Sequence, residues 1–240
     1  MSSNKAGKSV SAAELAAQLQ RDPEYQAREK EKERTRLARA AATHGDAARV
    51  IQELVAAGFP VNSLADLRRE QSAYVRAIPI LLAWLPRIEN SDVKQDIVRC
   101  LSVPWAKSLA AAPLVEAFRL ADDSSETGLR WAIGNALEVV GDDAVLDDMI
   151  ELAKDRRYGR AREMVVVGLG NMTDGRVLPV LIDLLNDDEV CGHAIIALGK
   201  LKALTACAYL KPFLKHPKSW MRTEAKKAIE KIDKSSRGLH

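Results

Sequence analysis

The chain has 240 residues, of which 47% are hydrophobic and 29% charged, and its formal net charge is +3. This composition is typical of a soluble protein with a substantial core. The longest apolar run, residues 77–85, is far shorter than the roughly 20 residues that cross a bilayer, so we expect no membrane-spanning segment and no membrane partner.

The low aromatic content of 5% means that Leu, Ile, Val and Ala fill the core, which favours closely packed helices over a β-sandwich. The first residues contain no apolar signal-peptide core, and we expect a cytoplasmic protein. The cysteines lie far apart without a C-x-x-C spacing, which argues against a zinc site or a disulfide framework. Buried free thiols are the expectation for Cys100, Cys191 and Cys207.

The N-terminal region is predicted to contain two helices. Asp22 and Pro23 form a helix start, with Asp as the cap and Pro in the first turn. Interleaved charges follow, as on an exposed helix, and Gly45 is predicted to end this helix. Asp46 then caps a second, amphipathic helix that stops at Gly58.

An internal repeat occupies the rest of the chain. Residues 165–185 share one apolar pattern with residues 133–153 and with residues 194–214. Each unit is predicted to be two short helices joined by a polar turn, because the apolar residues recur at helical spacing. The readable units are residues 77–106, 111–140, 143–172, 175–201 and 203–233.

The second helix of most units carries a basic residue seven positions before Leu or Ile, two turns away on the same face. The basic positions are Lys94, Arg130, Arg162 and Arg222, with Cys191 in the fourth unit. These bases could form a phosphate-binding stripe or a ladder that pairs with acids at the turns. We favour the ladder, because paired guanidinium groups hold repeats in register. The acids expected in it are Asp123, Asp155 and Asp187.

Three segments resemble a known repeat family. MRTEAKKAIEKI, residues 221–232, resembles the second helix of a HEAT repeat. ALEVVGDDAVLDDMIELAKD and GLGNMTDGRVLPVLIDLLNDD resemble the short bacterial HEAT-like repeats also found in bilin-lyase relatives. The resemblance implies an all-α, right-handed α-solenoid of armadillo type with about five HEAT-like helix pairs and extra N-terminal helices; it implies no activity. The expected parts are a disordered tail, N-terminal helices, the solenoid and a second tail, over residues 1–10, 11–76, 77–233 and 234–240.

The stretch MVVVGLGNMTDG, residues 164–175, looks like a β-strand that enters a nucleotide-binding turn. A dinucleotide fingerprint requires a third glycine, and Thr173 occupies that position. The repeat alignment instead places Gly168 and Gly170 in a helical segment, where small residues let neighbouring helices approach closely. We therefore predict helix packing here and no phosphate site.

No residue pattern singles out catalysis. The histidines show no metal-ligand spacing, and no Ser-His-Asp order emerges. His193 is interpreted as a half-buried packing residue rather than a base. We therefore expect no catalytic residue, no cofactor, no metal and no enzyme activity.

The exposed columns of the second helices are the best candidates for a binding surface. In the HEAT-like register, the positions one, four and five residues after the basic residue face the groove. Valines and isoleucines at these positions in the third and fourth units are not expected to face bare water. Either the N-terminal helices fold over the groove or a partner docks there. The predicted partner-binding residues are Arg99, Trp131, Asn135, Val166, Val167, Ile195, Ile196 and Lys227.

The C-terminal end is basic, since residues 200–240 contain 11 Lys or Arg against 3 Asp or Glu. These lysines could contact phosphates, or they could belong to a solvated terminal repeat in which lysine near helix ends suits the dipole. Our first hypothesis is a non-enzymatic scaffold that holds a protein partner on the concave face. The alternative is a nucleic-acid-binding module similar to the HEAT-like DNA glycosylases, which would use the basic end. A bilin-lyase-like enzyme is a third hypothesis, by repeat resemblance alone.

Overall fold

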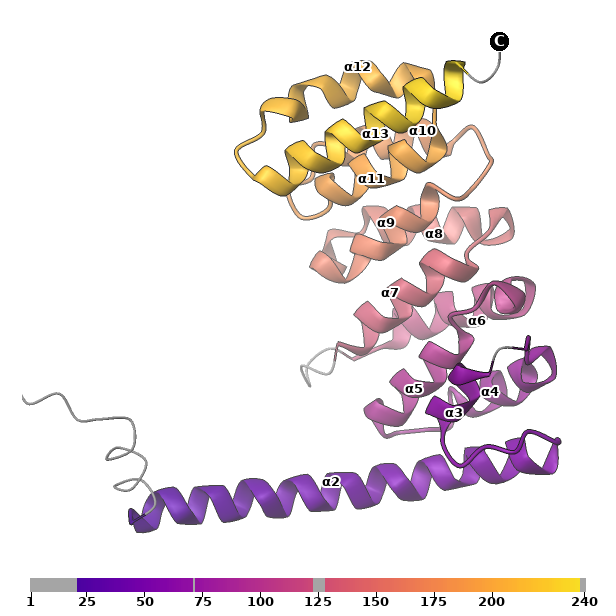
Figure 1. Cartoon of the computed structure of the whole chain (residues 1–240), viewed down its shortest axis with the longest axis vertical. Helices are drawn as coiled ribbons and strands as arrows, with labels where there is room; N and C mark the ends of the chain where they lie inside the picture. The colour runs from indigo at the N-terminus through magenta and orange to yellow at the C-terminus, as the bar shows by residue number, and fades with distance from the viewer. Residues whose placement is uncertain (1–20, 71, 123–127, 238–240) are drawn as a thin grey trace, which may run out of the picture. The chain divides into compact units, whose positions relative to one another are not determined.

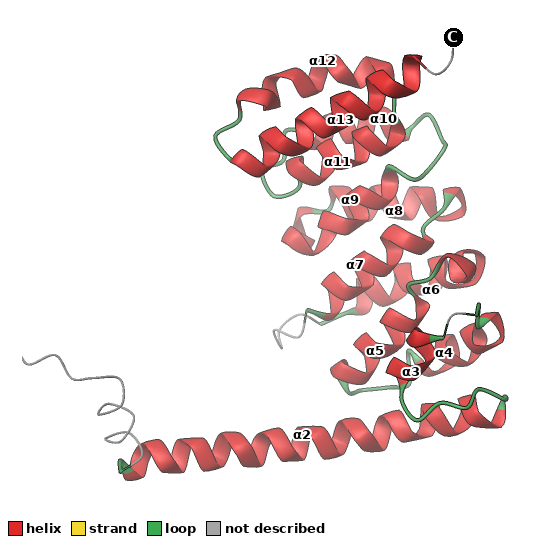
Figure 2. Ribbon diagram, viewed as in Figure 1, coloured by secondary structure: helices red, strands yellow, loops and turns green. Residues whose placement is uncertain are grey.

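The computed structural model describes residues 21–70, 72–122 and 128–237 (Figure 1). Within these ranges all regular structure is helical and there is no strand (Figure 2). The predicted all-α class is therefore confirmed. The chain divides into two units, residues 1–45 and residues 46–240.

The described part of the first unit belongs to α2, a continuous helix over Pro23–Ala56. Its start is as predicted, because the Glu24 backbone N–H donates to the Asp22 carboxylate at 2.9 Å. The prediction that Gly45 ends this helix is wrong. A glycine inside a helix costs only about 1 kcal/mol relative to alanine, so one glycine between good helix formers does not stop the helix. The tail expected over residues 1–10 lies outside the described residues.

The second unit contains the end of α2, then α3 (Leu64–Arg69), and then the helix pairs. Ser63 caps α3, since its hydroxyl accepts a hydrogen bond from the Asp66 backbone N–H at 3.2 Å. Leu54 of α2 and Leu67 of α3 are fully buried. Both helices therefore contribute to the core of this unit.

Five helix pairs follow in the described part of the chain, near the five predicted repeat units. The second pair begins at Lys107 and the last pair ends at Arg237, both outside the predicted bounds. The first helices are α4 (Ile78–Trp84), α6 (Lys107–Leu120), α8 (Leu146–Lys154), α10 (Val177–Leu184) and α12 (Cys207–Leu210). The second helices are α5 (Ser91–Leu101), α7 (Leu129–Val140), α9 (Glu163–Leu169), α11 (Cys191–Leu201) and α13 (Ser219–Arg237). Short 3-10 segments flank them: η1 (Val75–Ala77), η2 (Pro104–Ala106), η3 (Asp143–Val145), η4 (Arg156–Arg162), η5 (Leu204–Ala206) and η6 (Lys211–Lys215).

Polar residues in the turns begin several of these elements. The Asn90 side chain accepts hydrogen bonds from two backbone N–H groups at the start of α5. Asp142 and Asp155 cap η3 and η4, each accepting a hydrogen bond from one backbone N–H group. These caps satisfy N–H groups that have no partner inside the helix, so the turn sequences fix where each helix begins.

Neighbouring pairs pack through their second helices. α5 contacts α7, α7 contacts α9, α9 contacts α11, and α11 contacts α13, in chain order from magenta to yellow in Figure 1. A single cluster of buried apolar side chains extends through this unit from Val50 to Ile232. Among the described helices, none is both long enough and apolar enough to cross a membrane.

Candidate functional site

The glycine stretch is a helix and its end, as predicted. A Cβ atom on Gly170 would lie 2.6 Å from the carbonyl oxygen of Ala197, and one on Gly168 would lie 3.2 Å from the Cα of Glu138. A side chain at Gly170 would overlap the Ala197 backbone, and one at Gly168 would require its neighbours to move by a few tenths of an ångström. The two glycines therefore let α9 approach α11 on one side and α7 on the other, and the prediction of helix packing is confirmed.

The basic column binds the end of the first helix in its own pair. Arg130 Nε donates to the Phe118 carbonyl at 3.0 Å, and Arg162 Nη1 donates to the Ala153 carbonyl at 3.0 Å. In the last pair, Arg222 Nη1 donates to the His216 carbonyl at 2.7 Å. These carbonyls lie at or beyond the end of a helix, where an intrahelical partner is missing and positive charge is favoured. Arg130, Arg162 and Arg222 of the column thus act as C-terminal caps.

Cys191 keeps part of this role where the base is missing. Its Sγ donates to the Asp188 carbonyl at 3.8 Å, a weak bond from a thiol. Cys100 and Cys191 are buried, Cys207 is half-buried, and all three are free. In the described residues, no group of three His, Cys, Asp or Glu side chains could hold a metal ion.

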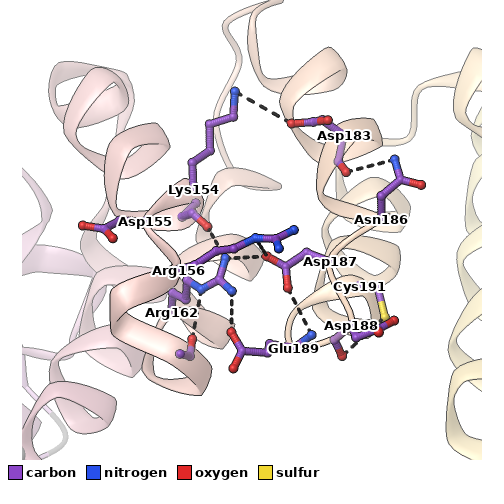
Figure 3. Close-up of polar contacts among 12 residues, drawn as sticks. Lys154, Asp155, Arg156, Arg162, Asp183, Asn186, Asp187, Asp188, Glu189 and Cys191 are labelled. Atoms are coloured by element: carbon purple, nitrogen blue, oxygen red, sulfur yellow. Dashed lines mark hydrogen bonds and ion pairs between the residues drawn. The ribbon is translucent and has the colours of Figure 1, made fainter.

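Arg162 also reaches the next pair (Figure 3). Its side chain has no exposed surface, and its Nη1 and Nη2 atoms lie 2.8 Å from Asp187 Oδ2 and 2.7 Å from Glu189 Oε2. Arg156 approaches the same Asp187 oxygen at 3.4 Å. Since Arg162 is the last residue of η4, directly before α9, and the two acids precede α11, the network joins the third pair to the fourth. The predicted ladder is confirmed for Arg162 and Asp187.

The environment keeps this pair ionised. Burial raises the pKa of Asp187, but hydrogen bonds from Arg162 and from the Glu189 backbone N–H hold it below its ordinary value. Burial lowers the pKa of Arg162, whereas Asp187 and Glu189 together raise it. Of the other expected acids, Asp155 pairs with Arg157 at 2.6 Å, and Asp123 lies outside the described residues.

Further ion pairs between helix pairs were not expected from the sequence. Arg119 of α6 bonds Asp148 and Glu151 of α8 at 2.7 and 2.9 Å. Arg176 bonds Asp147 at 2.6 Å. Arg119 and Asp148 are 29 positions apart, as are Arg176 and Asp147. Opposite charges one repeat length apart were the available signal.

The comparison with protein families decides which kind of repeat this is. Residues 161–187 match the model of the PBS lyase HEAT-like repeat. The chain carries a PBS lyase HEAT-like repeat. The match covers α9, α10 and the turn that ends at Asp187, so it contains both partners of the buried ion pair. No curated protein matches the chain significantly.

Several predicted partner-binding residues are accessible on the second helices. Trp131 is 53% exposed, and Arg99 and Lys227 are also exposed. Asn135 and Ile196 are half-buried. The structure places these five side chains on four different second helices, at positions one or five residues after the basic column.

The expectation that the other three residues are exposed is wrong: Val166, Val167 and Ile195 are buried. The position four residues after the basic column is buried in four successive helix pairs, at Val98, Gly134, Val166 and Ile195. A Cβ atom on Gly134 would lie 3.0 Å from the Ala161 carbonyl oxygen of the next pair. This column therefore faces the neighbouring pair and belongs to the core.

Sequence reasoning missed a titratable pair beside these helices. The Glu163 carboxylate is buried and accepts from Arg160 Nε at 2.7 Å, while His193 Nε2 lies 3.8 Å from its other oxygen. Burial lowers the pKa of His193 more than the charge of Glu163 raises it, so the imidazole is largely neutral at pH 7. The centroid of the imidazole ring lies 6.0 Å from the centroid of the Trp220 ring. His193 is thus a half-buried packing residue, as predicted.

Proposed function

We propose that the helix pairs form a right-handed HEAT-like solenoid, and that the protein is a cytoplasmic, non-enzymatic scaffold. In this proposal a protein partner binds the concave face made by the second helices. The order of contacts from α5 to α13 and the matched HEAT-like repeat both support it. Stacked repeats of this kind present long surfaces that suit binding better than chemistry.

Trp131 is the observation that carries the proposal. Its indole is 53% exposed on α7, although a tryptophan is among the side chains that gain most from burial. Asn135 lies one turn further along and donates to the Trp131 carbonyl at 2.8 Å. Tryptophan is enriched among residues that dominate interface energetics, and charged residues such as Arg99 and Lys227 suit a polar rim.

The buried residues take a supporting role in this proposal. Val166, Val167 and Ile195 hold the second helices together beneath the surface, and Ile196 remains as a partly accessible contact. The partner would therefore meet one aromatic anchor and scattered polar groups, with no apolar strip.

Replacing Trp131 with Ala tests the proposal. A partner captured from the native host and then purified should bind Trp131→Ala about thirtyfold more weakly or worse, because truncating an interface anchor costs at least about 2 kcal/mol. Isothermal titration calorimetry gives both affinities. Leu109→Ala is the matched control, since Leu109 of α6 is a large apolar side chain with comparable exposure. Equal binding by Trp131→Ala and the control would remove the second-helix surface as the docking site.

A further inference from the structure

The last helix pair has an unusual distribution of charge. Residues 190–223 contain no Asp or Glu. Three exposed lysines lie around the first helix of this pair. Lys202 lies just before η5, and Lys211 and Lys215 lie in η6. Within the described residues, none of these three ammonium groups takes part in an ion pair. The arginines of η4 differ, because Arg157 and Arg160 are neutralised by Asp155 and Glu163.

Large apolar side chains are exposed among these lysines. Leu204 is 61% exposed, Tyr209 is 50% exposed and Leu214 is 41% exposed. All three belong to the continuous helical segment of η5, α12 and η6. Exposed apolar side chains of this size on one short segment, where lysine supplies every charge, suit a contact surface.

The repeat fold does not require these side chains. In the alignment of residues 194–214 with residues 165–185, Leu204 stands opposite Gly175 and Lys211 stands opposite Ile182. The equivalent positions therefore accept a residue with no side chain in one case and an apolar side chain in the other. Packing between helices explains neither the exposed leucine nor the lysine.

The residue types discriminate between three kinds of anionic partner. Lysine is depleted in protein–protein interfaces, where arginine is enriched, so an acidic protein fits poorly. A nucleic acid offers phosphates to the lysines but no apolar phase to Leu204 and Leu214. An anionic bilayer offers both: headgroup phosphates for the ammonium groups, and acyl chains a few ångströms deeper for the leucines. The tyrosine ring and the aliphatic part of each lysine side chain suit the boundary between the headgroups and the acyl chains.

We propose that Lys202, Leu204, Tyr209, Lys211, Leu214 and Lys215 form a peripheral docking surface for anionic bilayer headgroups. Combining an apolar contact with a basic cluster is what stable surface attachment requires, since either signal alone is weak. The contact is peripheral and needs no membrane-spanning helix. This proposal replaces the expectation, drawn from the sequence, that no membrane is a partner. The surface is separate from the Trp131 surface, so the protein would carry its partner to the membrane.

Sedimentation of the full chain with lipid vesicles tests this surface. The protein should bind vesicles of phosphatidylcholine with phosphatidylglycerol, bind pure phosphatidylcholine far less, and lose binding as salt is raised. Lys211→Gln with Lys215→Gln should lower the partition coefficient about 25-fold, at about fivefold for each lysine near an anionic surface. Leu204→Ser should lower it about tenfold or more, because the leucine no longer enters the apolar layer.

Matched controls separate this surface from general charge and hydrophobicity. Lys231→Gln with Lys234→Gln makes the same charge change on α13, and Leu120→Ser removes a leucine that is 82% exposed on α6. Both should bind vesicles as the parent does, and circular dichroism should show every variant folded.

The proposal is overturned if the controls lose as much binding as the test variants. It is also overturned if Leu204→Ser binds normally while single-stranded DNA competes with the vesicles, which would make the site a polyanion site. Because no protein partner is present, failure here leaves the Trp131 proposal standing.

Discussion

Arg162 is the residue whose burial has the clearest energetic consequence. A guanidinium group withdrawn from water is costly unless its N–H groups all find partners. Here Nε donates to the Gly159 carbonyl at 3.0 Å, and the two terminal nitrogens serve the Ala153 carbonyl, Asp187 and Glu189. The side chain therefore does two tasks at once: it caps α8 and it ties the third pair to the fourth.

Replacing Arg162 with Met should lower the free energy of unfolding by about 3 kcal/mol, because a buried carboxylate at Asp187 loses its strongest partner. Urea unfolding followed by circular dichroism measures the change. Arg157→Gln is the control, since Arg157 is exposed and, among the described residues, its ion pair is with Asp155, two positions earlier. This variant should unfold like the parent. Equal effects of the two substitutions would show that the Arg162 network contributes no more than a surface pair.

Close approach of the second helices is the property that defines these elements. Gly170 meets the Ala197 backbone, and Gly199 meets Ala228, where an added Cβ would lie 2.8 Å from the alanine Cβ. These contacts involve equivalent positions in successive pairs. They keep the helix axes close and give each helix a well-packed apolar contact with its neighbour.

Gly170→Ala should destabilise the protein by about 1 to 3 kcal/mol, because the neighbouring contacts are backbone atoms that cannot move aside without shifting a helix. Differential scanning calorimetry should show a lower Tm. Gly175→Ala makes the same chemical change where nothing lies within 4 Å of the added methyl group, and it should leave Tm unchanged or slightly higher. A lower Tm in both variants would mean that flexibility of the turn, and not space, explains the glycines.

At the scale of the whole second unit, stability should vary along the array. α9 has a second helix on each side, whereas the segment of α12 and η6 exposes Tyr209 and Leu214. Local opening costs less where fewer apolar contacts are lost. Hydrogen exchange detected by mass spectrometry should therefore find slower exchange in α7, α9 and α11 than in α12 and η6. Uniform protection across these helices would indicate that the array unfolds only as one cooperative body.

The helix pairs could be predicted because apolar residues that recur every three or four positions lie on one face of a helix. At Gly168 and Gly170 the alignment of the repeats was also needed, because it placed the two glycines in a helical segment. The orientation of each face was harder to predict. Neighbouring positions on a helix point about 100° apart, so a register error of one residue turns Val166 from the groove into the seam between helices. Gly45 was misread for another reason: a single unfavourable residue does not outweigh the helix formers around it.

The position of Cys191 has a consequence for how the last pair is attached. Arginine at the equivalent place in the third pair recruits two acids from its neighbour, but between α11 and α13 the described residues contain no ion pair. The indole of Trp220 fits over Gly192, and Gly199 meets Ala228, so contact there is apolar. The Arg119–Asp148 contact between the second and third pairs weakens as ionic strength rises, whereas the last joint responds to temperature and to cosolvents that act on apolar surface. The last joint therefore depends on apolar packing, and a screening salt such as sodium chloride should weaken it less than the joint between α6 and α8.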